Sequence, residues 1–325
     1  HIMYLLMVAQ NQKNGTGQRH QNAFAQVSSM KTGQASRFEK AVLLALSRLA
    51  ATTTPSSSKK HRAAINNGQS LFHESQKDYD CCMRILIIRH ADPDYKIDGL
   101  TKEGQKEANA LAQYLKNIPI DAIYVSPLGR AQRTMEPYLK ESGTSMKPIV
   151  LDWLREFLAL VPHDSTRISW DILPSTLEEG GDTCFDPSRW MESLPFYRAS
   201  KDLKEQYEEV CQGLEKVLNL HGYHKVGHHY ETEKGNQQTI AFFCHFGVES
   251  VMLSYLLNAS PVTFWQGTCA VPSSITSLYT EERREGIASF RMNQFGGTPH
   301  LDLAGLEPSF SARFSETFDD PRRHD

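Results

Sequence analysis

The sequence lacks the features that would mark it as a membrane protein, a disulfide-stapled protein or a zinc protein with thiolate ligands. No apolar run approaches the roughly 18–20 residues that a membrane-spanning helix needs. Its 6 cysteines include no C-x-x-C pair and are too few for a disulfide framework in 325 residues. We therefore expect reduced thiols, a cytoplasmic location and no thiolate-bound metal.

A large excess of charge of one sign is also missing. The net charge is −3 with 22% charged residues, which argues against a nucleic acid or a membrane surface as partner. The hydrophobic content of 40% is ordinary, and the length is ample for a sizeable core. No internal repeat is visible, so one large α/β domain or two small ones are expected.

The average composition hides two unlike parts of the chain. Residues 1–82 hold 10 Lys and Arg against 4 Asp and Glu, whereas residues 83–325 hold 25 against 34. The first part is rich in Ser, Thr, Gln and Asn, and we expect a disordered or poorly packed extension there. A Ser-rich, acid-poor targeting leader is the alternative, and the initial His-Ile-Met resembles a cloning remnant. A compact domain is predicted to begin at Met83.

Beyond Met83, short apolar runs alternate with amphipathic segments. Continuous β-branched or aromatic runs are typical of strands buried on both faces of a parallel sheet. Such strands are predicted at 84–88, 121–125, 147–151, 239–244, 274–280 and 287–292. Helices are predicted to begin at Thr101, at Pro127 after a Ser126 cap, and over 202–220 and 248–257.

This alternation predicts an α/β fold, a three-layer α/β/α sandwich with a largely parallel central sheet. Residues 157–200 show no clean period and carry two tryptophans, several prolines and a Gly-Gly pair. That stretch is too long for a simple loop, so it is predicted to be an inserted, irregular cap. Residues 307–325 form a polar tail.

Two histidines follow two of the predicted strands. His90 comes after the first strand through Arg89, and His245 comes directly after the strand at 239–244. In open α/β sheets, ligands bind beyond the carboxyl ends of the strands. A single histidine in such a place is usually structural, but two at corresponding positions indicate a site.

Two arginines complete the candidate set. Arg89 precedes His90, and Arg130 lies in the first turns of the helix predicted after the second strand. A guanidinium offers a planar fork of donors that suits phosphate oxygens, and a helix start adds backbone N–H groups. Arg133, three residues beyond Arg130, is interpreted as solvated.

These residue types predict phosphoryl transfer through a histidine. A neutral imidazole is a nucleophile near pH 7, and phosphoryl transfer needs little beyond positioning and charge stabilisation. Arg89, Arg130 and His245 would bind the phosphate and His90 would attack it, with no metal or cofactor. A leaving alkoxide needs a proton, and Glu156 is favoured as the donor. Asp164, Asp171 and Glu178 are the alternative proton donors.

Four blocks of sequence, in order, resemble the histidine phosphatase (phosphoglycerate mutase-like) superfamily. They are Arg89-His90-Ala91, Leu100-Thr-Lys-Glu-Gly-Gln-Lys-Glu-Ala108, Ser126-Pro-Leu-Gly-Arg-Ala-Gln-Arg-Thr134 and Cys244-His-Phe-Gly-Val248. The resemblance implies that His90 is transiently phosphorylated and that water then attacks the phosphohistidine. It also implies a phosphate pocket of Arg89, Arg130 and His245, and an acid from the stretch that holds Glu156.

The chain departs from the family pattern directly after the first block. Ala91 stands where the family usually has a glycine after Arg-His. The next four residues, Asp92-Pro-Asp-Tyr95, differ from the sequence that the mutase branch normally has at this place. This argues against a sugar-phosphate mutase and removes an asparagine that often contacts phosphate.

Three other functions stay open. A phosphomutase and a non-enzymatic protein that binds phosphorylated ligands would both use the same pocket. A metal-dependent phosphohydrolase would use His90, Asp92 and Asp94, or His163 and Asp164, as ligands. The cluster of His221, His224, His228 and His229 is interpreted as an exposed loop.

The substrate is predicted only as a small phosphorylated metabolite or a phosphoprotein, and the oligomeric state is open. Every phosphomonoester presents the same dianion to the pocket, so discrimination would fall to the cap. Aromatic and basic residues there are the candidate specificity contacts, namely Arg167, Trp170, Arg189 and Trp190.

Overall fold

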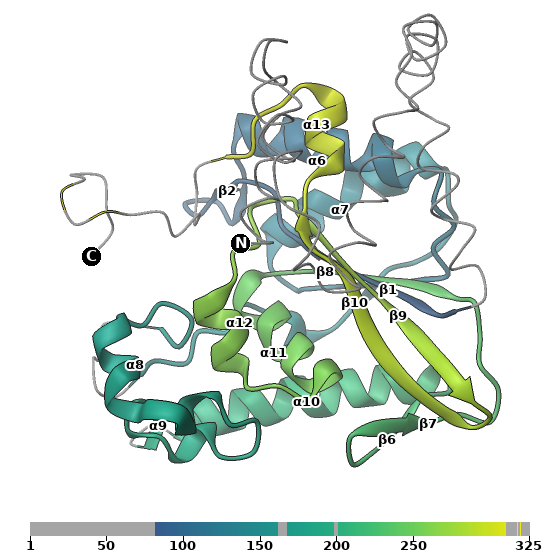
Figure 1. The fold of residues 1–325 in the computed structure, drawn as a ribbon. Helices are drawn as coiled ribbons and strands as arrows, with labels where there is room; N and C mark the ends of the chain where they lie inside the picture. The colour runs from purple at the N-terminus through teal and green to yellow at the C-terminus, as the bar shows by residue number, and fades with distance from the viewer. Residues whose placement is uncertain (1–81, 162–167, 198–200, 310–316, 318, 320–325) are drawn as a thin grey trace, which may run out of the picture. The chain divides into compact units, whose positions relative to one another are not determined.

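A mixed sheet of eight strands lies at the centre of the residues that the computed structural model describes (Figure 1). Those residues are 82–161, 168–197, 201–309, 317 and 319. All of them fall within one unit of the chain, Ser75–Asp325. The predictions made for residues 1–81 lie outside the described part.

The sheet has a parallel half and an antiparallel half. Its strand order is β5-β4-β8-β1-β9-β10-β7-β6, and the first four strands pair in parallel, whereas every later pairing is antiparallel. The parallel strands are β1 (Arg84–Arg89), β4 (Ala122–Val125), β5 (Ile149–Val150) and β8 (Thr239–Cys244). The antiparallel ones are β6 (His224–Val226), β7 (His229–Glu231), β9 (Ile275–Arg284) and β10 (Ile287–Gly297).

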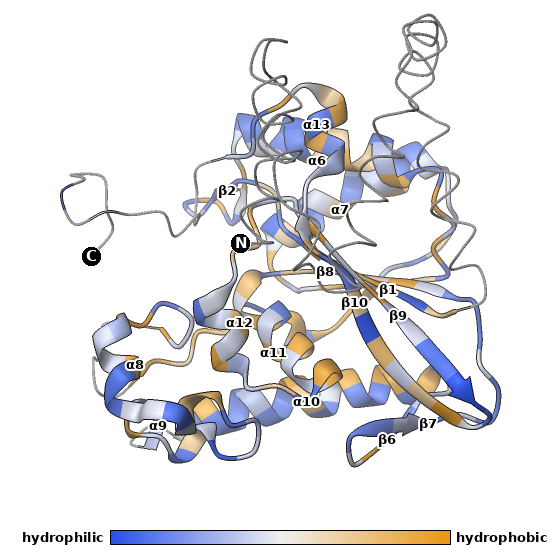
Figure 2. Ribbon diagram, viewed as in Figure 1, coloured by the Kyte–Doolittle hydropathy of each residue, from blue (hydrophilic) through white to orange (hydrophobic). Residues whose placement is uncertain are grey.

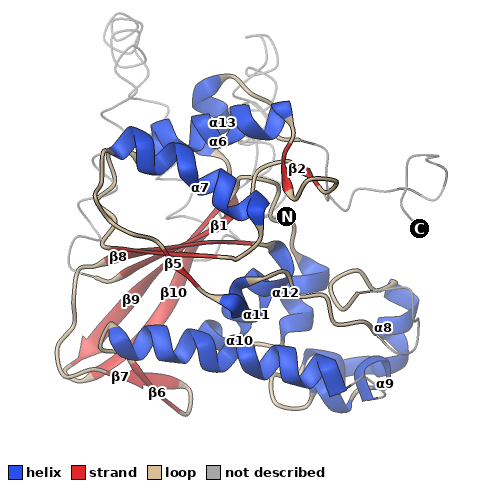
Figure 3. Ribbon diagram, turned by 180° about the vertical axis from the view of Figure 1, so that it is seen from behind, coloured by secondary structure: helices blue, strands red, loops and turns tan. Residues whose placement is uncertain are grey.

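Helices cover both faces of the sheet, which confirms the predicted three layers (Figures 1 and 3). One layer holds α6 (Lys102–Leu115), α7 (Gly129–Ser142) and α13 (Pro299–Ala304). The other holds α10 (Lys201–Leu220), α11 (Phe246–Leu257) and α12 (Pro261–Gly267). Among the described helices, none is both long enough and apolar enough to cross a membrane.

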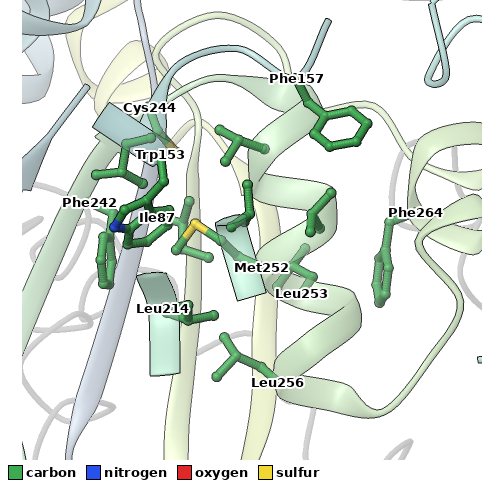
Figure 4. Close-up of a cluster of buried hydrophobic side chains, with 14 of the residues drawn as sticks. Ile87, Trp153, Phe157, Leu214, Phe242, Cys244, Met252, Leu253, Leu256 and Phe264 are labelled. Atoms are coloured by element: carbon green, nitrogen blue, oxygen red, sulfur yellow. The ribbon is translucent and has the colours of Figure 1, made fainter. Parts of the chain in front are cut away.

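A separate apolar core fills each interface between the sheet and a helical layer. The larger core packs Ile87 and Phe242 of the sheet against Leu214 of α10 and Met252 of α11 (Figure 4). The smaller core lies between the sheet and α6 and α7. Hydrophobic residues line the inward sides of α6 and α10, and hydrophilic residues face outward (Figure 2). Because α11 packs against α10, α12 and the strands β1 and β10, ten of its twelve residues are buried.

Most of the predicted elements are confirmed. Strands β1, β4 and β8 and helices α6, α10 and α11 lie where the apolar periods place them. Thr101 caps α6 as expected, because its hydroxyl accepts a hydrogen bond from the Gly104 N–H at 3.0 Å. Helix α7 continues through Pro137 to Ser142.

Two local predictions are wrong. Helix α7 begins at Gly129, two residues later than expected, and its N-cap is Leu128 in place of Ser126. The histidine-rich stretch 221–229 is not a simple loop, since it contains the β6–β7 hairpin. His221 lies inward, 2.9 Å from the Tyr124 hydroxyl.

The described residues of the predicted cap hold short helices in place of a wholly irregular chain. They are α8 (Pro174–Gly180), α9 (Leu194–Tyr197) and 3-10 turns at Gly181–Phe185 and Trp190–Glu192. Proline at the first turn of α8 starts that helix, and Gly181 with φ 54° ends it.

The start of α6 is fixed by a close backbone approach. A Cβ at Gly104 would lie 2.2 Å from the carbonyl oxygen of Asp92, so only glycine fits there. Thr101 binds the same residue twice, through its N–H to the Asp92 carbonyl oxygen at 3.1 Å and through its hydroxyl to the carboxylate at 2.7 Å. These contacts hold the chain that follows His90 against α6.

We predict that Gly104→Ala lowers the free energy of unfolding by about 1–3 kcal/mol, because the new Cβ must displace backbone and not a flexible side chain. Urea unfolding of the full chain measures this. Gly267→Ala is the matched control, since nothing lies within 4 Å of a Cβ there. An equal midpoint shift in the two variants would contradict the close-approach account.

Candidate active site

The carboxyl ends of neighbouring parallel strands bring the predicted histidines together. The register of β1 and β8 pairs Arg89 with Cys244, and the His90 N–H donates to the Cys244 carbonyl oxygen at 3.0 Å. His90 and His245 therefore leave the sheet at the same level, and their ring centroids lie 5.0 Å apart. Strand β4 lies beside β8 and ends at the same edge, where it delivers Ser126.

The backbone holds His90 in one tautomer. Its Nδ1 lies 2.8 Å from the carbonyl oxygen of Ala91, which can only accept, so the neutral ring carries its proton on Nδ1 and a lone pair on Nε2. Burial, together with the positive charge of Arg89, lowers the pKa of His90 well below its ordinary value. Nε2 therefore stays unprotonated at pH values where an exposed histidine would be charged.

His245 is fully buried beside His90 and is oriented by Ser126. Its Nε2 lies 2.8 Å from the oxygen of the Ser126 hydroxyl, and that oxygen accepts a hydrogen bond from the Leu128 N–H at 3.2 Å. If the hydroxyl donates to Nε2, the neutral ring carries its proton on Nδ1, which has no hydrogen-bond partner among the described residues. Burial and the neighbouring His90 lower the pKa of His245 well below its ordinary value. The ring is thus a neutral donor to an anion.

Arg89 and Arg130 bring two guanidinium groups to the same edge of the sheet. Nη1 of Arg89 donates to the carbonyl oxygen of Ala270, and the guanidinium lies 5.9 Å from the centroid of the Phe246 ring. The Nε atom of each arginine is buried without a hydrogen bond to any described residue. A buried donor is costly unless it meets an acceptor, so these N–H groups indicate where an oxyanion would bind.

Glu156 is also buried and lies beside Gly247, two residues after His245. Its Oε1 accepts hydrogen bonds from the N–H groups of Phe157 at 2.8 Å and Gly247 at 2.9 Å. Both bonds end on Oε1, which leaves Oε2 to carry the proton of the acid form. Burial raises the pKa of Glu156, even though Arg89 and the two hydrogen bonds oppose the shift. Such a carboxyl is suited to donate a proton.

Of the predicted specificity residues that the structure describes, Trp170 is the one that lies beside the site. A Cβ on Gly247 would lie 2.6 Å from the Trp170 ring and 2.7 Å from Oε1 of Glu156, so both side chains cover that glycine. The indole N–H of Trp170 donates to the Phe157 carbonyl oxygen at 2.9 Å.

The other three specificity residues are placed differently. Trp190 is 2% exposed and packs against the rings of Phe196 and Trp265, so it belongs to the core and the prediction of a substrate contact is corrected. Arg189 is exposed and pairs with Glu192 at 2.9 Å. Arg167 lies outside the described residues.

Comparison with known proteins identifies this arrangement. Residues 85–172, which contain β1 from its second residue onward, α6, β4, α7 and Glu156, match the family model of the histidine phosphatase superfamily, branch 1. The part of the chain that holds His90, Arg130 and Glu156 thus matches the histidine phosphatase superfamily.

Similar members of the superfamily are known from sequence and structure. Phosphoserine phosphatase 1 of Hydrogenobacter thermophilus is 24% identical over 216 residues, which cover 63% of this chain and 90% of that protein. A mycobacterial glucosyl-3-phosphoglycerate phosphatase matches with 17% identity and a TM-score of 0.47 over 66% of this chain and 99% of its own. An Entamoeba histolytica phosphoserine phosphatase mutant in complex with phosphoserine matches with 19% identity and a TM-score of 0.44, covering 67% and 99%.

Three residues at or beside the candidate site are not predicted from the sequence. Ser126 was interpreted as a helix cap, and its contact with His245 depends on the pairing of β4 with β8. Asp98 binds Arg130 from a turn whose only sequence signal is the dipeptide Asp-Gly. Glu249 is fully buried on α11, and an acid within an otherwise apolar helix was a signal that could have revealed it.

The acids proposed for the metal-dependent alternative make other contacts. The Asp92 carboxylate accepts from the Thr101 hydroxyl, and the Asp94 carboxylate accepts from the Lys96 N–H at 3.0 Å. Within the part of the chain that the structure describes, no group of three or more His, Cys, Asp or Glu side chains could hold a metal ion. His163 and Asp164 lie outside the described residues.

Glu249 should make stability depend on pH. Its side chain is fully buried, and burial raises its pKa to about 7, offset only in part by a hydrogen bond from Thr276 and by the charge of Arg89. The unfolded chain releases this proton near its ordinary value of 4.5, so the folded protein binds more protons between these two values. Its stability contribution therefore falls as pH rises from about 4.5 to about 7.

We predict that Glu249→Gln raises the free energy of unfolding by about 1–3 kcal/mol at a pH above 8 and by much less at pH 5. Urea unfolding at both values measures the difference. Glu285→Gln, on an exposed turn, is the control. A stabilisation by Glu249→Gln that is the same at both pH values would contradict the account.

Proposed function

We propose that this protein is a phosphomonoester hydrolase that forms a covalent phosphohistidine on His90. The observation that carries the proposal is the pairing of two buried, neutral histidines at one sheet edge with the arginines Arg89 and Arg130. A nucleophile with a fixed lone pair and donors for a dianion are what phosphoryl transfer requires.

In the first step, Nε2 of His90 attacks phosphorus, and the bond from phosphorus to the ester oxygen breaks. Arg89, Arg130 and the Nδ1–H of His245 stabilise the negative charge on the three other oxygens. Glu156 gives its proton to the leaving alkoxide, so that an alcohol departs and a carboxylate is left behind. The proton on Nδ1 of His90 makes a positively charged phosphoimidazolium, which the Ala91 carbonyl oxygen stabilises.

In the second step, water attacks the phosphorus atom of the phosphohistidine. The Glu156 carboxylate takes a proton from the water as the new oxygen bond forms and the bond to Nε2 breaks. Inorganic phosphate leaves, and both residues return to their starting states. The raised pKa of Glu156 fits this cycle, because the group must be protonated in one step and ionised in the next.

The substrate proposed is a small phosphorylated metabolite. The names of similar proteins include phosphoserine phosphatase and glucosyl-3-phosphoglycerate phosphatase, and both name small phosphomonoesters. A panel of phosphoserine, phosphothreonine, 3-phosphoglycerate, sugar phosphates and a phosphopeptide would rank them. The aromatic Trp170 beside Glu156 is the cap residue proposed to contact the leaving group.

The reaction proposed uses no metal ion, because two arginines and a histidine supply the charge stabilisation. We predict that wild-type protein hydrolyses para-nitrophenyl phosphate in excess EDTA, and that His90→Ala lowers kcat/KM by on the order of 10³-fold or more. His228→Ala, which removes an exposed histidine, is the control and should keep wild-type activity.

Each other outcome points to a different function. Activity that disappears in EDTA and returns with Mn²⁺ or Zn²⁺ would indicate the metal-dependent alternative. Absence of hydrolysis in all conditions, with inorganic phosphate still bound, would indicate a mutase or a protein that only binds phosphorylated ligands. Undiminished turnover by His90→Ala would remove His90 as nucleophile.

We predict that Glu156→Gln slows phosphoserine or another alkyl phosphate by about 100-fold, because an alkoxide cannot leave without a proton. The same variant should slow the phosphorylation step with para-nitrophenyl phosphate far less, since nitrophenolate leaves unprotonated. Pre-steady-state rates with both substrates measure the difference. Glu178→Gln, an exposed acid of the cap, is the control. Equal slowing of both substrates would assign the proton donor to another residue.

The pH profile should follow the same two groups. The lowered pKa of His90 places the acidic limb of kcat/KM below the ordinary histidine value of 6.5. The raised pKa of Glu156 places the alkaline limb for alkyl phosphates above the ordinary value of 4.5. Glu156→Gln should therefore abolish the alkaline limb and leave the acidic one. An alkaline limb that survives in this variant would be inconsistent with the assignment.

A further inference from the structure

The turn that joins β2 (Pro93–Asp94) to β3 (Gly99–Leu100) lies against Arg130 and carries a residue that the proposed reaction does not use. Oδ1 of Asp98 lies 2.8 Å from Nη1 of Arg130, in an ion pair. The same guanidinium lies 5.4 Å from the centroid of the Tyr95 ring. The turn therefore contacts the arginine at one edge and over one face.

The second oxygen of Asp98 holds the helix from which Arg130 projects. Oδ2 accepts from the N–H of Gly129, the first residue of α7, at 2.6 Å. The N-cap residue of α7, Leu128, makes no side-chain bond to the helix. Asp98 thus supplies from another part of the chain the carboxylate that a helix start favours. One side chain fixes both the start of α7 and the guanidinium that follows.

The close approach of the turn to α7 has local costs. Asp98 has φ 45°, in the left-handed region that favours glycine. A Cβ on Gly129 would lie 2.3 Å from the backbone oxygen of Asp98, so a glycine is required at that position of the family motif. A geometry of this kind persists only where the contacts that it makes offset its strain.

The base of the turn is anchored. Thr101 holds Asp92 through two hydrogen bonds, and the Asp92 N–H donates to the Glu107 carboxylate at 2.8 Å. Asp98 itself stays ionised. Burial alone would raise its pKa, but the hydrogen bonds from Gly129 and Arg130 outweigh burial and hold the pKa below its ordinary value. A fixed anion therefore faces Arg130 throughout the neutral range.

We infer that Asp98 is a positioning residue for phosphoryl transfer, which holds Arg130 so that its other edge faces the phosphoryl oxygens. Asp98 uses Nη1, whereas the buried Nε has no hydrogen bond to a described residue. Nε and Nη2 form a planar fork that suits two phosphate oxygens, and a fork already oriented loses less entropy on binding. The inference rests on the proposed function, since it needs Arg130 to bind the phosphoryl group.

The variant that tests this is Asp98→Asn. An asparagine retains one oxygen, which can still cap Gly129, while its NH₂ group cannot accept from Nη1 of Arg130. We predict that orthovanadate, which mimics the five-coordinate transition state, binds about 10-fold more weakly by calorimetry. Binding of inorganic phosphate should change by less than about 3-fold, because orientation matters most when charge spreads over the equatorial oxygens. The kcat for para-nitrophenyl phosphate should fall with the vanadate affinity.

A charge control is available on the same turn. Asp94→Asn removes one negative charge there and retains the oxygen that accepts from Lys96, so it should bind vanadate like the wild type. If Asp98 served only to cap α7, Asp98→Asn would leave both affinities unchanged. If it acted only by repelling anions, the variant would bind both anions more tightly. Either result would overturn the positioning role.

A double-mutant cycle tests the link to Arg130 directly. In the Arg130→Ala background, Asp98→Asn should change vanadate affinity by less than about 2-fold. A full effect of Asp98→Asn without Arg130 would contradict the inference. Because vanadate binding requires no turnover, the cycle separates this inference from the proposed function. The protein could hydrolyse no substrate and still lose vanadate affinity on Asp98→Asn only when Arg130 is present. That result would refute the proposed hydrolysis and leave the positioning role of Asp98 intact.

Discussion

The parallel pairing of β1 with β8 is the constraint on which the site depends. Two segments far apart in the sequence become neighbours in register, and the residue after each strand is a histidine. A slip of one residue would send every side chain of a strand to the opposite face of the sheet, and both faces of this half are filled by apolar cores. The packing that stabilises the sheet therefore also fixes the 5.0 Å separation of the His90 and His245 rings. The positions of the site residues at this edge therefore follow from the strand register, and the two apolar cores stabilise that register.

Burial at this edge of the sheet then shifts the pKa values of the ionisable groups that lie there. Removal from water disfavours the charged form of each group, so the pKa values of His90 and His245 fall and that of Glu156 rises. The histidines are thereby neutral and the carboxyl tends to keep its proton, which is the division that a nucleophile, a hydrogen-bond donor and a general acid require. The buried Nε groups of Arg89 and Arg130 favour an anion between them. Burial thus shifts the pKa values of His90, His245 and Glu156 in the direction that the proposed role of each needs.

Local signals made much of this predictable from the sequence. The continuous apolar runs located β1 and β8, and Thr101 located the start of α6, because each depends on residues that are close in the sequence. Arg89, His90, Arg130 and His245 were predicted together, since strand ends converge in a parallel sheet. The rest depends on contacts between distant segments. Ser126 uses its hydroxyl on His245, and a carboxylate 31 residues before Gly129 caps α7 in its place. The periodicity of apolar residues along the sequence does not predict contacts between distant segments. For the same reason it does not predict that Trp190 lies in the core, where it cannot contact a substrate.

The central claim is that the phosphoryl group passes through His90, and trapping the intermediate tests it most directly. The protein would be mixed rapidly with para-nitrophenyl phosphate and quenched in alkali, in which phosphohistidine survives, and its peptides would be analysed by mass spectrometry. The account predicts one phosphoryl group on the peptide that contains His90, at a level that falls as substrate is exhausted and is absent in His90→Ala. A phosphoryl group on another residue, or steady hydrolysis by His90→Ala with no phosphorylated peptide, would contradict it.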